Sequence, residues 1–413
     1  MKYVVNRLCG GSFFWRYKTK MQVTIMANQY IGQRGYTGAV LKLPAGKAGI
    51  ADALACAHTP SEKEIALKWF EDWPQFLDNV LEACGEKKLE EVNLLAYKLS
   101  QMNEAQLNTY EGAIKLRQED GNRIDMKELI NICYNLDSFV FQPDILNDNM
   151  LGELCLMGEL LDVIQEASDE VLEMLDEEKV GRALRKSDKG VFTTKGYLFF
   201  GSDIWTETYD GIHLPEYPDI HEGVISLRLN SLDCNPEKHT GVWLDLPAGE
   251  MEIDQALKRL EVSSLNSCII TEVKSIVPLF NYQIASDTDI NELNILAERI
   301  QTFPDGETLI KYKAVLEFEQ SNDLELNLNI ANNLNCYELD PSIISLECYA
   351  EQVFQKAGID TNDPSFAYFD FRGYGERYML KKGAAMTPYG VASRNEQTFV
   401  WESARSVSDM VMQ

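Results

Sequence analysis

The sequence predicts an α+β protein of two tandem modules, elongated overall, each built from small antiparallel sheets and a helical bundle. Three observations support this fold class. Short runs of alternating apolar residues end at Pro and Gly, as is typical of half-buried strands. Longer segments place apolar residues three and four positions apart, which indicates amphipathic helices. Finally, three sequence blocks occur twice, in the same order, along the 413 residues.

The most similar pair of blocks contains a short strand of each module. Residues 37–46 read TGAVLKLPAG and residues 240–249 read TGVWLDLPAG, so seven of ten positions are identical at an offset of 203. The alternation predicts a strand, which Pro and Gly then end. An Ala-Leu pair follows each copy at the same offset, inside a predicted helix. The sequence therefore uses the unit strand, turn, helix twice.

Two further pairs of blocks follow. Residues 131–136 (NICYNL) correspond to residues 329–334 (NIANNL) at an offset of 198. Asp176, Gly181 and Gly196 correspond to Asp370, Gly375 and Gly390 at an offset of 194. Because the offset drifts so little, we interpret the chain as a duplicated module of roughly 160 residues. The predicted divisions are a basic N-terminal extension (1–20), a first module (21–200), a connector (201–239), a second module (240–393) and a C-terminal tail (394–413).

Individual elements follow from local patterns. Two strands are predicted within residues 23–43, with Gly32 and Gly35 supplying the turn. Ser61 followed by Glu64 has the pattern of a capping box and favours a helix over residues 61–69. Other helices of the first module are predicted at residues 47–57, 73–84, 89–102, from 103 onwards, and 125–134. In the second module, strands are predicted at 242–246 and 268–273, and helices at 252–260, 289–302, 306–317, 324–331 and 343–357.

Residues 152–178 have the clearest amphipathic pattern and predict one long helix. Leu161, Ile164 and Leu175 are among the apolar residues that recur every three or four positions. No base interrupts the opposite face, so carboxylates roughly 5–6 Å apart are expected in a row. The alternative interpretation is a solvated helix face that only keeps the protein soluble. Such a face would normally alternate acidic and basic residues. The candidate partner-binding residues here are Glu166, Asp169, Glu170, Glu173, Asp176 and Glu177.

Net charge is the most unusual property of the chain. The 65 acidic and 38 basic residues give a net charge of −27. Residues 1–20 contain five bases and no acid, whereas residues 21–100 sum to −2, residues 101–236 to −16 and residues 237–413 to −14. Such a surface repels DNA, RNA and anionic membranes and attracts basic proteins. We therefore expect neither direct nucleic-acid binding nor membrane binding.

Cysteine usage favours a cytoplasmic protein. The nine cysteines form no CxxC pair, and scattered thiols of this kind are typical of a reducing compartment. No run of 18 apolar residues predicts a membrane span. Residues 1–20 lack the apolar core of a signal peptide, and Met21 precedes a natural opening strand. We interpret residues 1–20 either as an upstream misreading of the start or as a basic arm.

The sequence contains no recognisable enzyme motif. GxSxG, P-loop, strand-associated GxGxxG and HExxH patterns are all missing. His213 and His221, with nearby acids, are the candidate metal ligands, but their spacing matches no known ligand pattern. We therefore predict a binding protein without catalytic residues, metal site or cofactor.

Several segments together point to a known family. They are residues 21–25 (MQVTI), 240–247 (TGVWLDLP), 290–294 (INELN), 368–377 (YFDFRGYGER) and 387–390 (TPYG). In this order they resemble the antirestriction protein ArdA family, which is carried on plasmids and conjugative elements. The resemblance is closest over residues 240–392. It reaches residues 23–200 mainly through the internal repeat.

The resemblance implies an elongated acidic protein that mimics bent B-form DNA. Such a mimic occupies the DNA-binding groove of type I restriction-modification enzymes and protects incoming DNA. Family members usually dimerise, and a tandem chain would replace that dimer internally, so homodimerisation stays open. The alternative is an acidic adaptor for another basic protein of a mobile element or defence system, such as a relaxase or a CRISPR effector. In the second module the candidate partner-binding residues are Asp287, Asp289, Glu292, Glu317, Glu319, Asp323 and Glu325.

Overall fold

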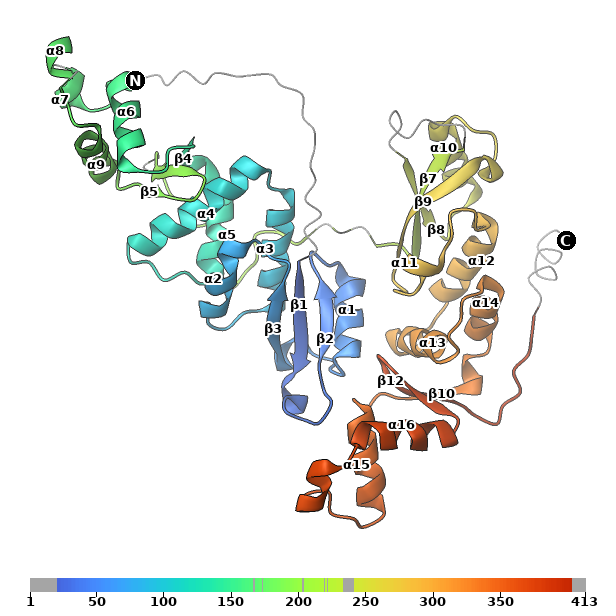
Figure 1. Ribbon diagram of the computed structural model, residues 1–413. Helices are drawn as coiled ribbons and strands as arrows, with labels where there is room; N and C mark the ends of the chain where they lie inside the picture. Colours follow the sequence, from blue (N-terminus) through green and yellow to red (C-terminus); the bar gives the residue numbers. More distant parts are fainter. Residues whose placement is uncertain are drawn as a thin grey trace. The chain divides into compact units, whose positions relative to one another are not determined.

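The computed structural model describes residues 21–165, 168–172, 174–202, 204–218, 220, 222–232 and 241–402 (Figure 1). Its chain divides into two compact units. Unit 1 contains residues 70–218 together with Met21 and Gln22, and unit 2 combines residues 23–69 with the part of the chain after residue 218. Each unit therefore combines separate stretches of the sequence, because residues 23–69 pack with the C-terminal half of the chain.

Residues 23–69 form a small sheet with one helix. Strand β1 (Gln22–Ala27) lies between β2 (Ala39–Lys42) and β3 (Ile65–Glu71), and α1 (Lys47–Cys56) packs against β2. Strand β3 shows that the helix predicted for residues 61–69 is wrong. Ser61 does cap a helix, by accepting a hydrogen bond from the Lys63 N–H, but that helix is a single 3₁₀ turn. A capping pattern specifies only a first turn, and the apolar residues that follow pair with β1 instead.

Unit 1 consists of a helical bundle followed by a layer of one sheet and several helices. The bundle contains α2 (Asp78–Ala83), α3 (Leu89–Gln101), α4 (Glu104–Glu119) and α5 (Met126–Tyr134). The second layer contains β4 (Phe139–Pro143), α6 (Asp148–Gly158), α7 (Asp162–Gln165), α8 (Asp169–Leu172), α9 (Glu177–Asp188), β5 (Val191–Phe192) and β6 (Gly196–Phe200). Strand β6 lies between β4 and β5 and is antiparallel to both.

The C-terminal part of unit 2 repeats this arrangement. Its first sheet contains β7 (Ile225–Ser231), β8 (Val242–Leu246) and β9 (Cys268–Ser275), with α10 (Glu250–Leu260) between the last two strands. Four helices follow: α11 (Phe280–Gln283), α12 (Ile290–Gln301), α13 (Gly306–Phe318) and α14 (Leu324–Asn332). The last layer contains β10 (Tyr337–Asp340), α15 (Leu346–Lys356), α16 (Phe371–Lys381), β11 (Ala384–Thr387) and β12 (Gly390–Arg394). Strand β7 lies within the predicted connector, and its buried Ile225, Leu227 and Leu229 belong to the core.

The strand orders agree with the duplication inferred from the sequence. The first strand is central in both β2-β1-β3 and β8-β7-β9, and the last strand is central in both β4-β6-β5 and β10-β12-β11. Two glycines of the third repeated block have the same role in both copies. A Cβ atom on Gly181 would lie 1.8 Å from the Asp148 carbonyl oxygen, and one on Gly375 would lie 2.2 Å from the Leu346 carbonyl oxygen. The α+β fold class is confirmed.

The continuous helix predicted over residues 152–178 is wrong. Helix α6 ends at Gly158, and Glu159 adopts a left-handed conformation with φ of 47°. The chain then forms two single turns, α7 and α8, before α9 begins. Helix α9 packs back against α6, and this return requires a break between them. The apolar residues expected on one helical face pack instead, from several short elements, around Leu151 and Cys155.

Two further observations concern the cysteines and the length of the helices. All seven cysteines in the described part of the chain are free thiols. Within that same part, every helix is too short or too polar to cross a membrane.

Candidate functional site

The helices α12, α13 and α14 of unit 2 carry an excess of negative charge. Between Asp289, which precedes α12, and Asn332, which ends α14, the sequence has nine acids and three bases. Helix α14 packs against both α12 and α13, so the three helices form one layer. Eight of the nine carboxylates are exposed, and Glu319 is half-buried. We name this layer the α12–α14 surface.

Three of the carboxylates also begin the helices. The side chains of Asp289, Asp305 and Asp323 accept hydrogen bonds from backbone N–H groups of the first turns of α12, α13 and α14. The Thr308 N–H and hydroxyl both donate to Asp305 at 2.7 Å, which lowers the pKa of this carboxyl group. Negative charge at a helix N-terminus also interacts favourably with the helix dipole. The three carboxylates are therefore fixed at the starts of their helices, and the lowered pKa keeps Asp305 ionised at neutral pH.

Two of the three bases in this layer are used for internal contacts. Lys313 is only 4% exposed, and its Nζ lies 2.6 Å from Asp52 Oδ1 on α1. Arg299 donates to Asn332 Oδ1 at 2.7 Å and to the Ala331 carbonyl at 3.1 Å. Lys311 is the third base. The α12–α14 surface therefore keeps an excess of negative charge that its own bases do not balance.

Asp52 is also the centre of a polar cluster that sequence reasoning missed. The Tyr389 hydroxyl donates to Asp52 Oδ1 at 2.9 Å, next to the Lys313 ammonium. Burial raises the pKa of Tyr389 and raises that of the Cys56 thiol to about 12. The ion pair joins residues 261 positions apart, so no local pattern could predict it. It ties residues 23–69 to helix α13.

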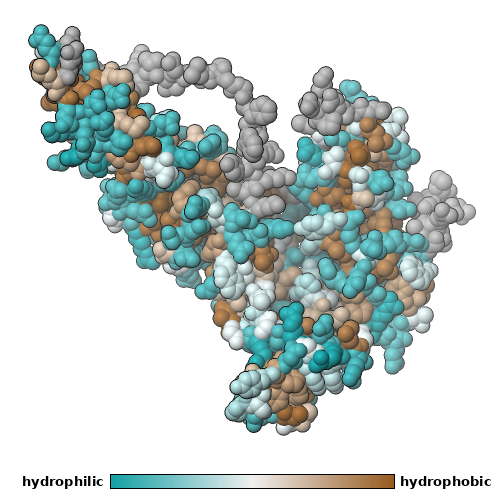
Figure 2. Space-filling view, viewed as in Figure 1, coloured by the Kyte–Doolittle hydropathy of each residue, from teal (hydrophilic) through white to brown (hydrophobic). Residues whose placement is uncertain are grey.

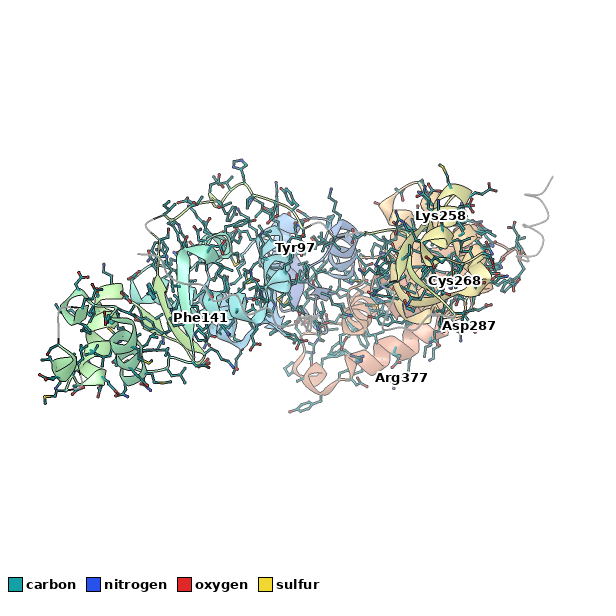
Figure 3. The ribbon with its side chains drawn as sticks, turned by 90° about the horizontal axis from the view of Figure 1, so that it is seen from above. Tyr97, Phe141, Lys258, Cys268, Asp287 and Arg377 are labelled. Atoms are coloured by element: carbon teal, nitrogen blue, oxygen red, sulfur yellow. The ribbon has the colours of Figure 1, made fainter. Side chains whose placement is uncertain are left out.

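The seven acids predicted in the second module all lie on or beside the α12–α14 surface. Asp287 is exposed and follows Ser286, whose carbonyl accepts from the Ile270 N–H of β9 (Figure 3). Glu292 and Glu325 lie in first turns, and Glu317 lies in the last turn of α13, where partial burial raises its pKa. Glu319 differs, because Arg394 pairs with it at 2.7 Å. Asp289 and Asp323 are the helix caps already described.

The six acids predicted in the first module do not share one helix. Glu166 and Glu173 lie outside the described residues, and Asp169 begins α8. Glu170 is exposed. Asp176 caps α9 and pairs with Lys179 at 3.1 Å, while Glu177 accepts a hydrogen bond from Asn149. The row of carboxylates predicted from a single helix is therefore not formed by the described members of this set.

Two pairs of asparagines form a second feature that repeats. Asn333, which directly follows α14, exchanges hydrogen bonds with the backbone N–H and carbonyl of Val400, and Asn329 of α14 does the same with Glu402. Asn135, which directly follows α5, holds Thr206 in the same way, and Asn131 of α5 binds the backbone of residues 208 and 209. We name the held segments the first strap (residues 204–209) and the second strap (residues 398–402). The sequence signal was the Asn-x-x-x-Asn spacing inside the second repeated block.

The face of the molecule visible in Figure 2 is mostly polar. Figure 2 shows that hydrophilic residues cover most of the visible face and that hydrophobic residues occur in small patches. Among the described residues, no three His, Cys, Asp or Glu side chains are arranged to hold a metal ion. His213 contacts Asp210 at 3.0 Å, and His221 lies outside the described residues.

Comparison with known proteins gives one match. Residues 235–393 match the family model described as antirestriction protein (ArdA). No curated protein matches the chain. The matched region contains the whole α12–α14 surface and ends before the second strap.

Proposed function

From the match of residues 235–393 to the antirestriction protein (ArdA) family model, we propose that the protein inhibits type I restriction-modification enzymes as an acidic DNA mimic. In this proposal the α12–α14 surface occupies the DNA-binding groove of the enzyme. Incoming mobile-element DNA is then protected, because the groove is no longer free to bind it. The protein acts by binding and catalyses no reaction.

One observation carries the proposal: the α12–α14 surface has nine acids, and its buried Lys313 is turned away from solvent. Duplex DNA presents one negative charge per roughly 1.7 Å of its axis, and proteins bind it with Lys and Arg side chains. Carboxylates fixed on packed helices attract the same side chains and steer association. A disordered acidic tail would lose more conformational entropy on binding.

The test uses the full chain and a purified type I restriction-modification enzyme. We expect the protein to block cleavage of unmodified plasmid in competition with DNA, and the logarithm of its affinity to fall linearly with the logarithm of salt concentration. In cells, its expression should raise transformation by unmodified plasmid to the level of modified plasmid. Binding that is independent of salt, or cleavage that continues at saturating protein, would contradict the proposal. Salt-sensitive binding to a relaxase or CRISPR effector without protection from restriction would favour the acidic adaptor.

A further inference from the structure

The second strap brings an exposed aromatic residue to the α12–α14 surface. Asn329 Nδ2 donates to the Glu402 carbonyl at 3.1 Å and to the Glu325 carbonyl at 2.9 Å, so strap and helix α14 are held together. Asn332 Nδ2 also donates to the Glu402 carboxylate at 3.2 Å. Asn333 holds Val400, and Trp401 lies between Val400 and Glu402. The Val400 and Trp401 side chains are 57% and 61% exposed.

The repeat shows what is unusual about Trp401. Asn333 and Val400 correspond to Asn135 and Thr206, so Trp401 takes the place of Glu207 in the first strap. At the corresponding position on the helix, Glu325 of α14 replaces Lys127 of α5. In unit 1, Lys127 and Glu207 form an ion pair at 2.5 Å. In unit 2, an exposed indole and a carboxylate occupy these two positions, and no base in the described part of the chain pairs with Glu325.

We propose that Trp401, Val400 and the carboxylates of Glu325 and Glu402 form a docking site for an arginine side chain of a basic protein partner. A guanidinium group stacks on the face of an indole, and Trp is the strongest aromatic partner for a cation. The two carboxylates supply charge complementarity, and Val400 contacts the aliphatic stem of the arginine. Exposed Trp residues at the centre of a contact often dominate binding energy. The inference rests on the proposed function, since it assumes a basic partner, and it names the side chain recognised.

The test compares octa-arginine with octa-lysine, two probes of equal charge, by calorimetry with the full chain. Octa-arginine should bind about three-fold more tightly, since a lysine ammonium stacks less well on an indole than a guanidinium does. W401A should remove this preference while leaving octa-lysine binding nearly unchanged. W401L, which keeps apolar volume on the strap, should behave like W401A. A preference for octa-arginine that survives in W401A, or that returns in W401L, would overturn the proposal.

Trp69 on β3 offers a matched control, because its side chain is 59% exposed. W69A should keep the full preference for octa-arginine, and its loss there would also count against the site. With a type I enzyme, W401A should lower the affinity without changing the salt dependence, whereas E325Q should make the salt dependence shallower. If the enzyme is not bound but the preference still depends on Trp401, the proposed function fails and the docking site stands. If the enzyme is bound and the preference is missing, only the docking site fails.

Discussion

The two helical bundles have similar architecture and different electrostatics. From Lys88 to Tyr134, the α3–α5 bundle has eight acids and six bases, whereas the α12–α14 surface has nine acids and three bases. In unit 1 the bases pair with acids: Arg117 lies 2.5 Å from Glu128, and Lys98 contacts Glu216. A surface that neutralises its own charges gains little from a charged partner. We therefore propose that the second bundle binds the partner.

Two equivalent positions show how the difference arises. The hydroxyl groups of Tyr110 and Tyr312 each donate to a backbone carbonyl of the following helix at 3.1 Å, which aligns α4 with α13. In this alignment Glu317 stands where α4 has Lys115, as Glu325 stands where α5 has Lys127. Lys115 donates to the Phe192 carbonyl, so in unit 1 this position supports the fold. In the second bundle the same positions are acidic and exposed.

The largest expected effect concerns Lys313, the buried base of the second bundle. K313M would leave Asp52 as a charge of low exposure, with the Tyr389 hydroxyl as its remaining partner in the cluster, and should lower the free energy of unfolding by about 3 kcal/mol. Urea denaturation measures this change. The matched control is K311M, two residues earlier in the same helix, which should change stability by less than about 0.5 kcal/mol. The double variant D52N/K313M should recover much of the loss, because no unpaired charge remains. Equal effects of K313M and K311M would show that the ion pair is unimportant.

The next effect tests the comparison directly by giving the second bundle the bases of the first. E317K/E325K should weaken binding to the type I enzyme about ten-fold or more, because two carboxylates become two ammonium groups facing a basic groove. The control is E119K/D120K at the end of α4, which makes the same change in net charge in unit 1. That variant should bind nearly as well as the unaltered protein. If both variants lose affinity equally, net charge matters and the location of the acids does not.

The sequence predicted local features well and long-range contacts poorly. The helices α12 to α14 and the repeated Gly181 and Gly375 all follow from short patterns. The Lys313–Asp52 pair and the Glu319–Arg394 pair join distant segments, so no periodicity could show them. The helix predicted over residues 152–178 is wrong for the same reason, because a contact between distant segments breaks it. The apolar spacing fits one continuous helix as well as several short ones, and only the packing of α9 on α6 excludes the continuous helix.

The smallest expected effect concerns the N-cap residue of helix α13. Asp305 caps α13 where Asn103 caps α4, so one bundle uses a charged cap and the other a neutral cap. Hydrogen bonds from Thr308 lower the pKa of Asp305 in the folded state. The stabilisation is therefore complete above the unfolded pKa of about 3.8 and is lost as the pH falls through the lower folded pKa. D305N should leave the melting temperature at pH 7 nearly unchanged and should remove part of its decrease below pH 4, as measured by calorimetry. N103D should add such a decrease, and identical pH profiles for D305N and the unaltered protein would contradict a role for this charge.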